Sequence, residues 1–415
     1  LDIICFALVA AFVIFRLSRA LGRRPDDSQF GRTRRDAGNK VVAVVSAMGD
    51  TTDDLIALSE QVSKQPEPRE MDVLLSTVEL MSCTLMAMAL RSTGYKAISL
   101  SGAQAGIRTN SSYGQAQIDS MDPVRIIQEL NNDTIVIVAG FQGITEDQDV
   151  TTLGRGGSDT PAVALAAALG AARCEVYTDV DGIYTADPRL VPAAHKLDEI
   201  SFEEMLELAS YGAKMTPRSI ELGMVYNTPI LVASSFNDAP GTLIHGDADM
   251  NKHVGELRNR VSGIATDTNV SKITVRGVID RPGIAASLFE PLTEVGISVD
   301  VIVQNASVGG ATDMTFTVKR TDLAQAKQVV QRVANDLGSG EVVTASDLAK
   351  LSIVGTGMQD APGYASTMFR TLADEGINIE MITTSEIRIT CLVNENQVAQ
   401  AARALHTAFD LDTTK

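Results

Sequence analysis

The sequence predicts an α/β domain with a parallel-rich sheet sandwiched by helices, followed by two smaller α+β units. The first observation is an alternation of short apolar, β-branched runs with helix-like stretches, the runs at 41–46, 97–100 and 134–140 and the helices at 71–93 and 122–131. Apolar strands that alternate with helices are typical of a parallel sheet covered on both faces. The second observation is a strand–turn–helix pattern that occurs twice within residues 263–411, which predicts two similar units packed together.

Composition and charge restrict the possible functions. The chain has 415 residues, 45% of them hydrophobic, enough for two or three globular domains. Its formal net charge of −17 disfavours nucleic acid and anionic lipid as partners, because no basic excess exists to neutralise phosphates. The four cysteines lie far apart without a CxxC pair, which excludes a disulfide framework and indicates a reducing, cytoplasmic compartment. No histidine belongs to a triad or metal motif, and we expect each to be a surface residue: His195, His245, His253 and His406.

Residues 1–37 form an apolar and arginine-rich head that does not match the rest of the chain. The run from Ile3 to Phe15 has thirteen apolar residues, fewer than the roughly 17–25 that a membrane-spanning helix needs. Arginines follow the run, as at a cytoplasmic flank, and the chain opens on Leu1 rather than Met. Three interpretations remain open: a truncated membrane anchor, a buried core element, and a foreign segment joined by fusion or by an assembly error. We favour the error.

Two turns between strands and helices suit an anionic ligand. The strand at 41–46 leads through AMGDTT into a helix pattern near Asp53, where free backbone N–H groups attract negative charge. The segment 149–160 (DVTTLGRGGSDT) has three glycines, which let the backbone approach a ligand, and precedes a helix. Its Arg155 suits a carboxylate or a phosphate. The segment matches neither the Walker nor the dinucleotide fingerprint.

The segment 175–189 (EVYTDVDGIYTADPR) reads as a strand that leads into a turn-rich loop. Its acidic groups, aromatic rings and arginine suit a nucleotide, although an ordinary solvated loop has the same composition. Together these segments resemble aspartate kinase, within the amino-acid kinase superfamily. The resemblance runs from about Asp36 to near the C-terminus. It implies an amino-acid kinase domain at 38–245, a linker at 246–262, and two ACT domains at 263–340 and 341–411.

The resemblance implies phosphoryl transfer from ATP to the β-carboxylate of L-aspartate, which gives 4-phospho-L-aspartate. The cofactors are ATP and Mg²⁺, and since ATP carries the Mg²⁺, no metal site on the protein is expected. Catalysis of this kind depends on positioning and charge neutralisation. By similarity the catalytic residues are Arg155, Asp159 and Lys214. The aspartate-binding residues are Thr52, Glu79, Arg155, Ser158 and Asp159, with Glu79 at the amino group. The ATP-binding residues are Ser46, Thr178, Asp179, Tyr184, Asp187, Arg189 and Lys214.

The sequence departs from the family in three places. The family's opening strand with Lys-Tyr/Phe-Gly-Gly-Thr-Ser has no counterpart, and losing its lysine is expected to cost on the order of 10²–10³ in rate. The family's Gly-Glu turn reads Val78-Glu79. Because a β-branched residue does not readily adopt a positive φ, we expect Glu79 to be displaced. The stretch from Lys214 to Pro217 is one residue shorter than usual, which puts the register of Lys214 in question.

The tail repeats with an offset of 80 residues, since Pro282 and Gly296 have counterparts at Pro362 and Gly376. The repeat resembles tandem ACT domains, which implies lysine, threonine or both as inhibitory effectors, and simple dimerisation is the alternative. By similarity the effector-binding residues are Asp280, Gln304, Asn305, Ala306 and Thr312 in the first copy and Asn378, Ile379 and Glu380 in the second.

Two functions therefore remain open. One is a feedback-regulated aspartate kinase at the first step of lysine, threonine and methionine biosynthesis. The other is a catalytically impaired or inactive chain that acts as an amino-acid-binding regulatory subunit. Arg155, Asp159, Tyr184 and Lys214 favour the enzyme, and the missing lysine motif favours the second. We expect a homodimer through the ACT domains or a heterotetramer with a short ACT-only subunit, and no nucleic-acid or membrane partner.

Overall fold

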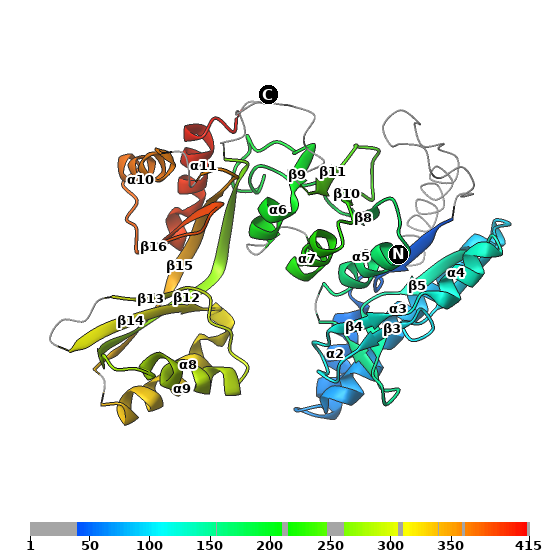
Figure 1. The fold of residues 1–415 in the computed structure, drawn as a ribbon, viewed down its shortest axis with the longest axis horizontal. Coiled ribbons are helices and arrows are strands. Elements are labelled where there is room, and N and C mark those ends of the chain that lie inside the picture. Colours follow the sequence, from blue (N-terminus) through cyan, green and yellow to red (C-terminus); the bar gives the residue numbers. More distant parts are fainter. Residues whose placement is uncertain are drawn as a thin grey trace. The chain divides into compact units, whose positions relative to one another are not determined.

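The computed structural model describes residues 40–154, 156–209, 215–246, 261–305, 310–338, 340–358 and 362–412. The chain divides into two compact units (Figure 1). The first comprises Leu1–Ile183, Leu197–Ala209 and Lys214–Lys252, and the second comprises Tyr184–Lys196, Ser210–Ala213 and His253–Lys415. The head at 1–37 and nearly all of the expected linker lie outside the described residues.

A parallel sheet lies at the centre of the first unit, in the order β1 (Val42–Val45), β5 (Ile135–Ala139), β2 (Ala97–Leu100). Every residue of β5 is buried, and its side chains alternate between two cores. Ile135, Ile137 and Ala139 face helix α3 (Pro68–Ser92). Val136 and Val138 lie in the opposite core with α4 (Val124–Asn131) and α5 (Asp159–Ala168). Helices thus cover both faces of the sheet, as the apolar runs predicted.

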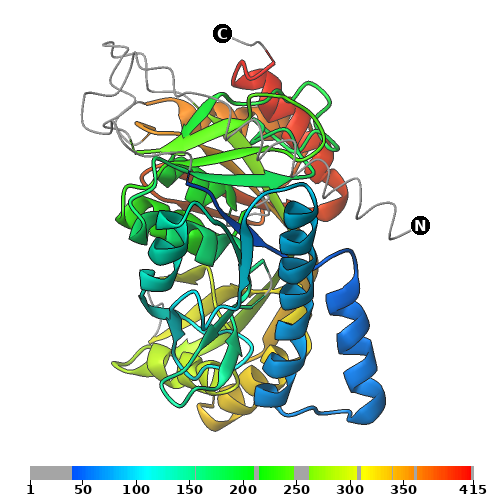
Figure 2. The ribbon, with the colours of Figure 1, turned by 90° about the vertical axis from the view of Figure 1, so that its right-hand side faces the viewer.

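Helix α3 is long and apolar enough to cross a membrane by length and composition alone. In the structure it is a core helix, because Cys83, Met86, Ala87 and Leu90 pack against β2 and β5. Helix α2 (Thr51–Val62) lies beside it (Figure 2).

A buried carboxylate ties α3 to the strand that precedes the glycine-rich segment. Asp72 accepts hydrogen bonds from the Gly114 N–H and from both the N–H and the hydroxyl of Thr152, at 2.6–3.0 Å. These three donors satisfy a charge that would otherwise be costly to bury.

Two further four-stranded sheets complete the first unit. The first has the order β4 (Ile118–Met121), β3 (Ile107–Thr109), β6 (Gln142–Ile144), β7 (Val150–Thr152). The second has the order β8 (Cys174–Thr178), β10 (Ile230–Ser234), β11 (Thr242–His245), β9 (Glu199–Ser201). Helix α6 (Phe202–Ala209) packs against this sheet, and α7 (Pro217–Val225) packs against α5 and α6.

Among the described residues, the second unit has a six-stranded antiparallel sheet and four α-helices. Its order is β13 (Ile302–Gln304), β14 (Ala311–Val318), β12 (Gly263–Ile279), β15 (Val342–Val354), β17 (Arg388–Asn394), β16 (Met381–Thr384). Helices α8 (Ile284–Glu294) and α9 (Leu323–Asp336) cover the core of the first repeat, and α10 (Tyr364–Asp374) and α11 (Val398–Ala408) cover that of the second. Gly283 and Gly363 have left-handed φ values of 88° and 119° at the starts of α8 and α10, which explains glycine in both Pro-Gly turns.

The two repeats exchange charges across their shared strands. β12 and β15 pair from Gly263–Val354 to Val275–Val342. Lys272 on β12 binds Glu380 of the second repeat at 2.8 Å, and Lys350 on β15 binds Asp300 of the first. The two acidic residues are equivalent, since they lie 80 positions apart. Each repeat therefore supplies the strand lysine for the other repeat's acidic residue.

Candidate active site

The candidate site lies at the carboxyl ends of the parallel strands β1 and β5, where ligands bind in open α/β sheets. Ser46 follows β1, and the Ser158 hydroxyl lies 3.1 Å from the Ser46 hydroxyl. Gly140 follows β5, and a Cβ there would lie 2.8 Å from Ser158 Oγ and 2.9 Å from the Val45 carbonyl oxygen. Glycine at this position is therefore what allows the two loops to approach. Ser46 and Ser158 are thus brought together from 112 residues apart.

Glu79 is the most buried acid at this end of the sheet. It lies inside α3 and is 3% exposed. Burial raises the pKa of its carboxyl group to about 7, although the Ala47 N–H, in the loop after β1, donates to it. Its Oε2 has no hydrogen-bond partner among the described residues. A buried oxygen without a partner is a costly acceptor, and a cationic donor would satisfy it.

The reason for expecting a displacement of Glu79, a turn at Val78 that needs a positive φ, does not apply. Val78 and Glu79 lie in the middle of α3 with no turn between them, and Val78 is not among the described residues with a positive φ. Val78 is a buried residue with helical geometry, so it does not distort the backbone at Glu79.

Asp159 is the first residue of α5. It accepts a hydrogen bond from the backbone N–H of Thr216, just before α7, but burial dominates and raises the pKa of its carboxyl group to about 6. Thr52 lies in the first turn of α2, where backbone N–H groups are left without helical partners. The helices that begin at Thr51 and Asp159 therefore both offer a positive dipole end on the carboxyl side of the sheet.

The residues predicted to bind ATP are divided between the two units. Thr178 and Asp179 belong to the first unit, and the Thr178 hydroxyl donates to Asp179 at 3.0 Å. Tyr184, Asp187 and Arg189 belong to the second unit. Arg189 is 87% exposed, and its guanidinium holds the Asp187 carboxylate through bonds of 2.7–3.1 Å. An exposed pair of this kind is weak enough for a phosphate to displace the carboxylate. Two expected catalytic residues, Arg155 and Lys214, lie outside the described residues.

The chain leaves the first unit at Ile183 and returns to it at Leu197, and these two neighbouring segments are called the neck. The Leu197 N–H donates to the Ile183 carbonyl oxygen at 2.8 Å, and the buried Thr242 hydroxyl bonds to both strands of the neck. Tyr184 and Lys196 continue the pairing as an isolated antiparallel bridge. Residues 184–196 are therefore a loop with closed ends, a division that local patterns in the sequence do not reveal.

The expected effector residues form two groups in the second unit. In the first repeat the Thr312 hydroxyl donates to the Asn305 carbonyl oxygen at 2.8 Å, and the Asp280 N–H donates to the Gly310 carbonyl oxygen. Gln304 ends β13, and Ala306 lies outside the described residues.

In the second repeat Asn378 donates to Glu380 at 3.2 Å, and Lys272 holds the pKa of Glu380 below its usual range. Ile379 packs against the core of this repeat.

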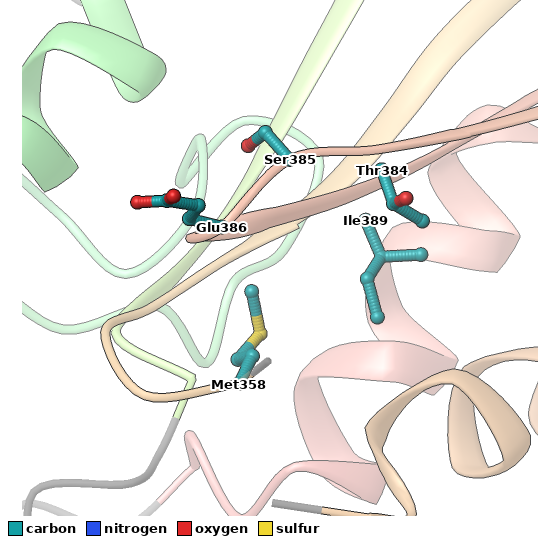
Figure 3. Close-up of a pocket in the computed structure, with 5 residues that line it drawn as sticks. All are labelled: Met358, Thr384, Ser385, Glu386 and Ile389. Atoms are coloured by element: carbon teal, nitrogen blue, oxygen red, sulfur yellow. The ribbon is translucent and has the colours of Figure 1, made fainter. Parts of the chain in front are cut away.

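A cavity of about 390 Å³ lies in the second repeat (Figure 3). Met358 and Ile389 give it an apolar side, and Thr384, Ser385 and Glu386 give it polar groups. These three residues lie 80 positions after Gln304, Asn305 and Ala306. The cavity is therefore the counterpart, in the second repeat, of part of the effector group expected in the first.

The expectation that the histidines are surface residues is wrong for two of them, because His245 and His406 are 4% and 0% exposed. His253 lies outside the described residues. His406 Nε2 lies 2.9 Å from Thr185 Oγ1, and His406 Nδ1 lies 2.6 Å from Asp412 Oδ1. No local pattern in the sequence indicates this contact, because Thr185 and His406 are 221 positions apart. Among the described residues, no group of three or more His, Cys, Asp or Glu is arranged to hold a metal ion.

The comparisons with known proteins agree along the chain. The model of the amino acid kinase family matches residues 29–234, and that of the ACT domain matches residues 273–333 and 351–409. The aspartate kinase Ask_LysC of Stutzerimonas stutzeri is 48% identical over 379 residues, which cover 91% of each chain. E. coli aspartokinase III in complex with aspartate and ADP is 30% identical, with a TM-score of 0.72 over 86% of this chain and 80% of that one. The same enzyme in complex with lysine and aspartate is 28% identical, with a TM-score of 0.68 over 90% of this chain and 93% of that one.

Proposed function

Since this chain belongs to the aspartate kinase family, we propose that it transfers the γ-phosphoryl group of ATP to the β-carboxylate of L-aspartate. The oxygen of the β-carboxylate forms the new bond to phosphorus, the bond to the β-phosphate oxygen breaks, and 4-phospho-L-aspartate and ADP leave. Mg²⁺ enters with ATP as part of that substrate. The observation that carries the proposal is Glu79, whose buried carboxylate has a free acceptor oxygen at the carboxyl end of the parallel sheet.

Glu79 is suited to the ammonium group of aspartate. An ammonium supplies three donors and a full positive charge, so it satisfies Oε2 and returns the pKa of Glu79 below neutrality. Glutamine would keep the shape of the side chain but lose this charge pairing. The assignment of Glu79 to the amino group of the substrate therefore has a direct test.

The reacting groups are both anionic, so the main task of the site is to neutralise charge. The N-termini of α2 and α5 offer backbone N–H groups to them. Arg155 and Lys214 supply the cations in this proposal, Arg155 at a substrate carboxylate and Lys214 at the phosphates. Ser158 and Asp159 hold aspartate beside the Ser46 loop, while Thr178, Asp179, Tyr184, Asp187 and Arg189 bind the nucleotide.

We assign regulation to the second unit, with lysine, threonine or both as effectors. E. coli aspartokinase III has been solved in complex with lysine and aspartate, which supports an amino acid as the effector. Asp280 and Glu380 are suited to an effector ammonium, and the backbone N–H groups of the Pro-Gly turns are suited to its carboxylate. The enzyme works in the cytoplasm, as a homodimer through its ACT domains or as a heterotetramer with a short subunit.

The test is ATP-dependent acyl-phosphate formation with L-aspartate, trapped as the hydroxamate. The wild-type chain is assayed beside a repaired chain, in which residues 1–37 are replaced by a strand with Lys-Tyr-Gly-Gly-Thr-Ser. Lysine and threonine are added singly and together. Activity in either chain supports the proposal, and activity only in the repaired chain identifies the head as a foreign segment. If neither chain forms hydroxamate while both bind lysine or threonine, the kinase proposal fails and the regulatory-subunit alternative replaces it.

A further inference from the structure

The loop that carries three of the proposed nucleotide-binding residues is built into the core of the second repeat. Within residues 184–196, Ala186 and Val191 are 5% and 2% exposed and belong to the hydrophobic core that contains Ala402 and Leu405 of α11. The Arg403 guanidinium, also on α11, donates to the Leu190 carbonyl oxygen at 3.2 Å. Helix α11 therefore contacts this loop through both apolar and polar groups.

A series of hydrogen bonds between Asp412, His406 and Thr185 fixes the loop at Thr185. The Asp412 carboxylate, whose pKa is lowered mainly by its hydrogen bond to His406, accepts from His406 Nδ1, so in the neutral ring Nε2 is an acceptor. The Thr185 hydroxyl then donates to Nε2 at 2.9 Å and accepts from the His195 N–H at 3.2 Å. We assigned this tautomer from the partners, and it leaves neither group unsatisfied.

The backbone of Thr185 is fixed as well. Its N–H donates to the His195 carbonyl oxygen at 3.0 Å, and its carbonyl oxygen accepts from the Ile264 N–H of β12 at 2.7 Å. Every hydrogen-bonding group of Thr185 is thus in use. The hydroxyl–imidazole–carboxylate order resembles that of a nucleophilic triad, but Thr185 is 1% exposed and His406 is 0% exposed. No substrate reaches these two residues. The hydrogen-bonded series Thr185–His406–Asp412 therefore fixes the position of the loop and does not act as a nucleophile.

We propose that Thr185 and His406 are positioning residues for nucleotide binding, through which helix α11 of the second repeat fixes the loop that presents Tyr184, Asp187 and Arg189 to ATP. The inference rests on the proposed function, which assigns these three residues to the nucleotide. Tyr184 is the direct neighbour of Thr185, and Asp187 is two residues further on. Loosening Thr185 therefore lowers the affinity for ATP and leaves the aspartate-binding groups of the first unit intact.

The test is a set of hydroxyl variants in the full chain. Thr185→Val removes the hydroxyl and keeps the shape, and Thr185→Ser keeps the hydroxyl. The matched control is Thr390→Val, because Thr390 in β17 is also fully buried and shares its hydroxyl with Ser352 at 2.7 Å. Losing a buried hydrogen bond typically corresponds to about a five- to tenfold change in an equilibrium constant. We therefore expect Thr185→Val to raise the KM for ATP about five- to tenfold and to leave the KM for aspartate and kcat within about twofold. We expect Thr185→Ser and Thr390→Val to leave all three within that range.

A second variant and a binding measurement keep the test independent of folding and of turnover. Arg403 is exposed, so Arg403→Ala is expected to fold and to raise the KM for ATP about two- to threefold. Titration with a fluorescent ADP analogue measures nucleotide affinity without catalysis. If neither the wild-type chain nor the repaired chain forms hydroxamate, but the wild-type chain binds the analogue and Thr185→Val weakens that binding, the proposed function fails and this inference stands.

The inference is overturned if Thr185→Val and Thr390→Val lower the melting temperature equally and change nucleotide affinity equally. It is also overturned if Thr185→Val raises the KM values for ATP and aspartate by the same factor, because a general loosening would have that effect. A wild-type chain that does not bind the ADP analogue overturns it as well, since the loop would then present nothing to a nucleotide.

Discussion

Replacing Glu79 with glutamine removes a titratable group from a buried position, and the effect on stability is expected to depend on pH. In the folded chain the pKa of this carboxyl group is raised from 4.5 to about 7 by burial. Between these values the folded state keeps a proton that the unfolded state has released, so the free energy of unfolding falls as pH rises. The shift corresponds to roughly 2–3 kcal/mol.

Glu79→Gln stays neutral at every pH, so its stability relative to the wild type increases as the wild-type carboxylate ionises. We expect the difference in the free energy of unfolding to widen by roughly 2 kcal/mol in favour of the variant between pH 5 and pH 8, measured in urea by far-UV circular dichroism. In the same variant the KM for aspartate rises about ten- to a hundredfold, because a hydrogen bond between charged groups is lost.

The control for loss of a formal charge is Glu60→Gln, on the exposed surface of α2, which we expect to give a constant difference from the wild type. A constant difference for Glu79→Gln as well would refute the argument from burial. A widened difference with an unchanged KM for aspartate would keep that argument and reject the ammonium-binding role.

Three other predictions concern packing and buried charge. Asp72→Asn removes a carboxylate that accepts from three donors. We expect urea denaturation to show a free energy of unfolding lower by about 2–4 kcal/mol, and an equally stable variant would contradict the stabilising role of the carboxylate. Gly140→Ala places a Cβ 2.8 Å from Ser158 Oγ and is expected to lower kcat/KM in the hydroxamate assay about tenfold, whereas an unchanged value would mean that the loops relax without consequence. Asp300→Asn leaves the buried Lys350 ammonium without its carboxylate, whereas Lys350→Met removes the ammonium itself. Thermal unfolding should therefore find Asp300→Asn less stable than Lys350→Met by about 1–3 kcal/mol. If Lys350→Met is the less stable variant, the argument from a buried charge is wrong.

The fold could be predicted largely from local patterns. The strand expected at 134–140 is Ile135–Ala139, because every side chain in it faces one of two apolar cores. The helix expected from residue 71 begins three residues earlier, since Pro68 occupies its first position, where the missing N–H costs nothing. The two repeats fold as expected because each has its own glycine at the start of a helix and its own apolar core.

The site could be predicted less completely, because part of it depends on contacts between distant residues. Glu79 was expected to bind substrate. Comparing Val78-Glu79 alone with the family's Gly-Glu turn could not show that these residues lie within a long helix. His406 lies in the last turn of α11, where a histidine is typical of a helix end, and its contacts with Thr185 and Asp412 cannot be seen in that local pattern. No local pattern predicts that residues 184–196 belong to the second unit. The two ends of this loop are joined partly by Thr242, which is distant in the sequence.

The exchange of lysines between the repeats has a consequence for how the second unit can be divided. Because Lys272 and Lys350 each bind an acidic residue of the opposite copy, a fragment that contains one copy loses the acidic residue that the other copy supplies to its strand lysine. A fragment with the first copy alone also loses β15, one of the two partners of β12, which is a strand of 17 residues. The edge of β12 that this opens is a template for pairing with other chains. A cut near residue 340 would therefore yield aggregating halves, and the two copies are interdependent parts of a single folding unit.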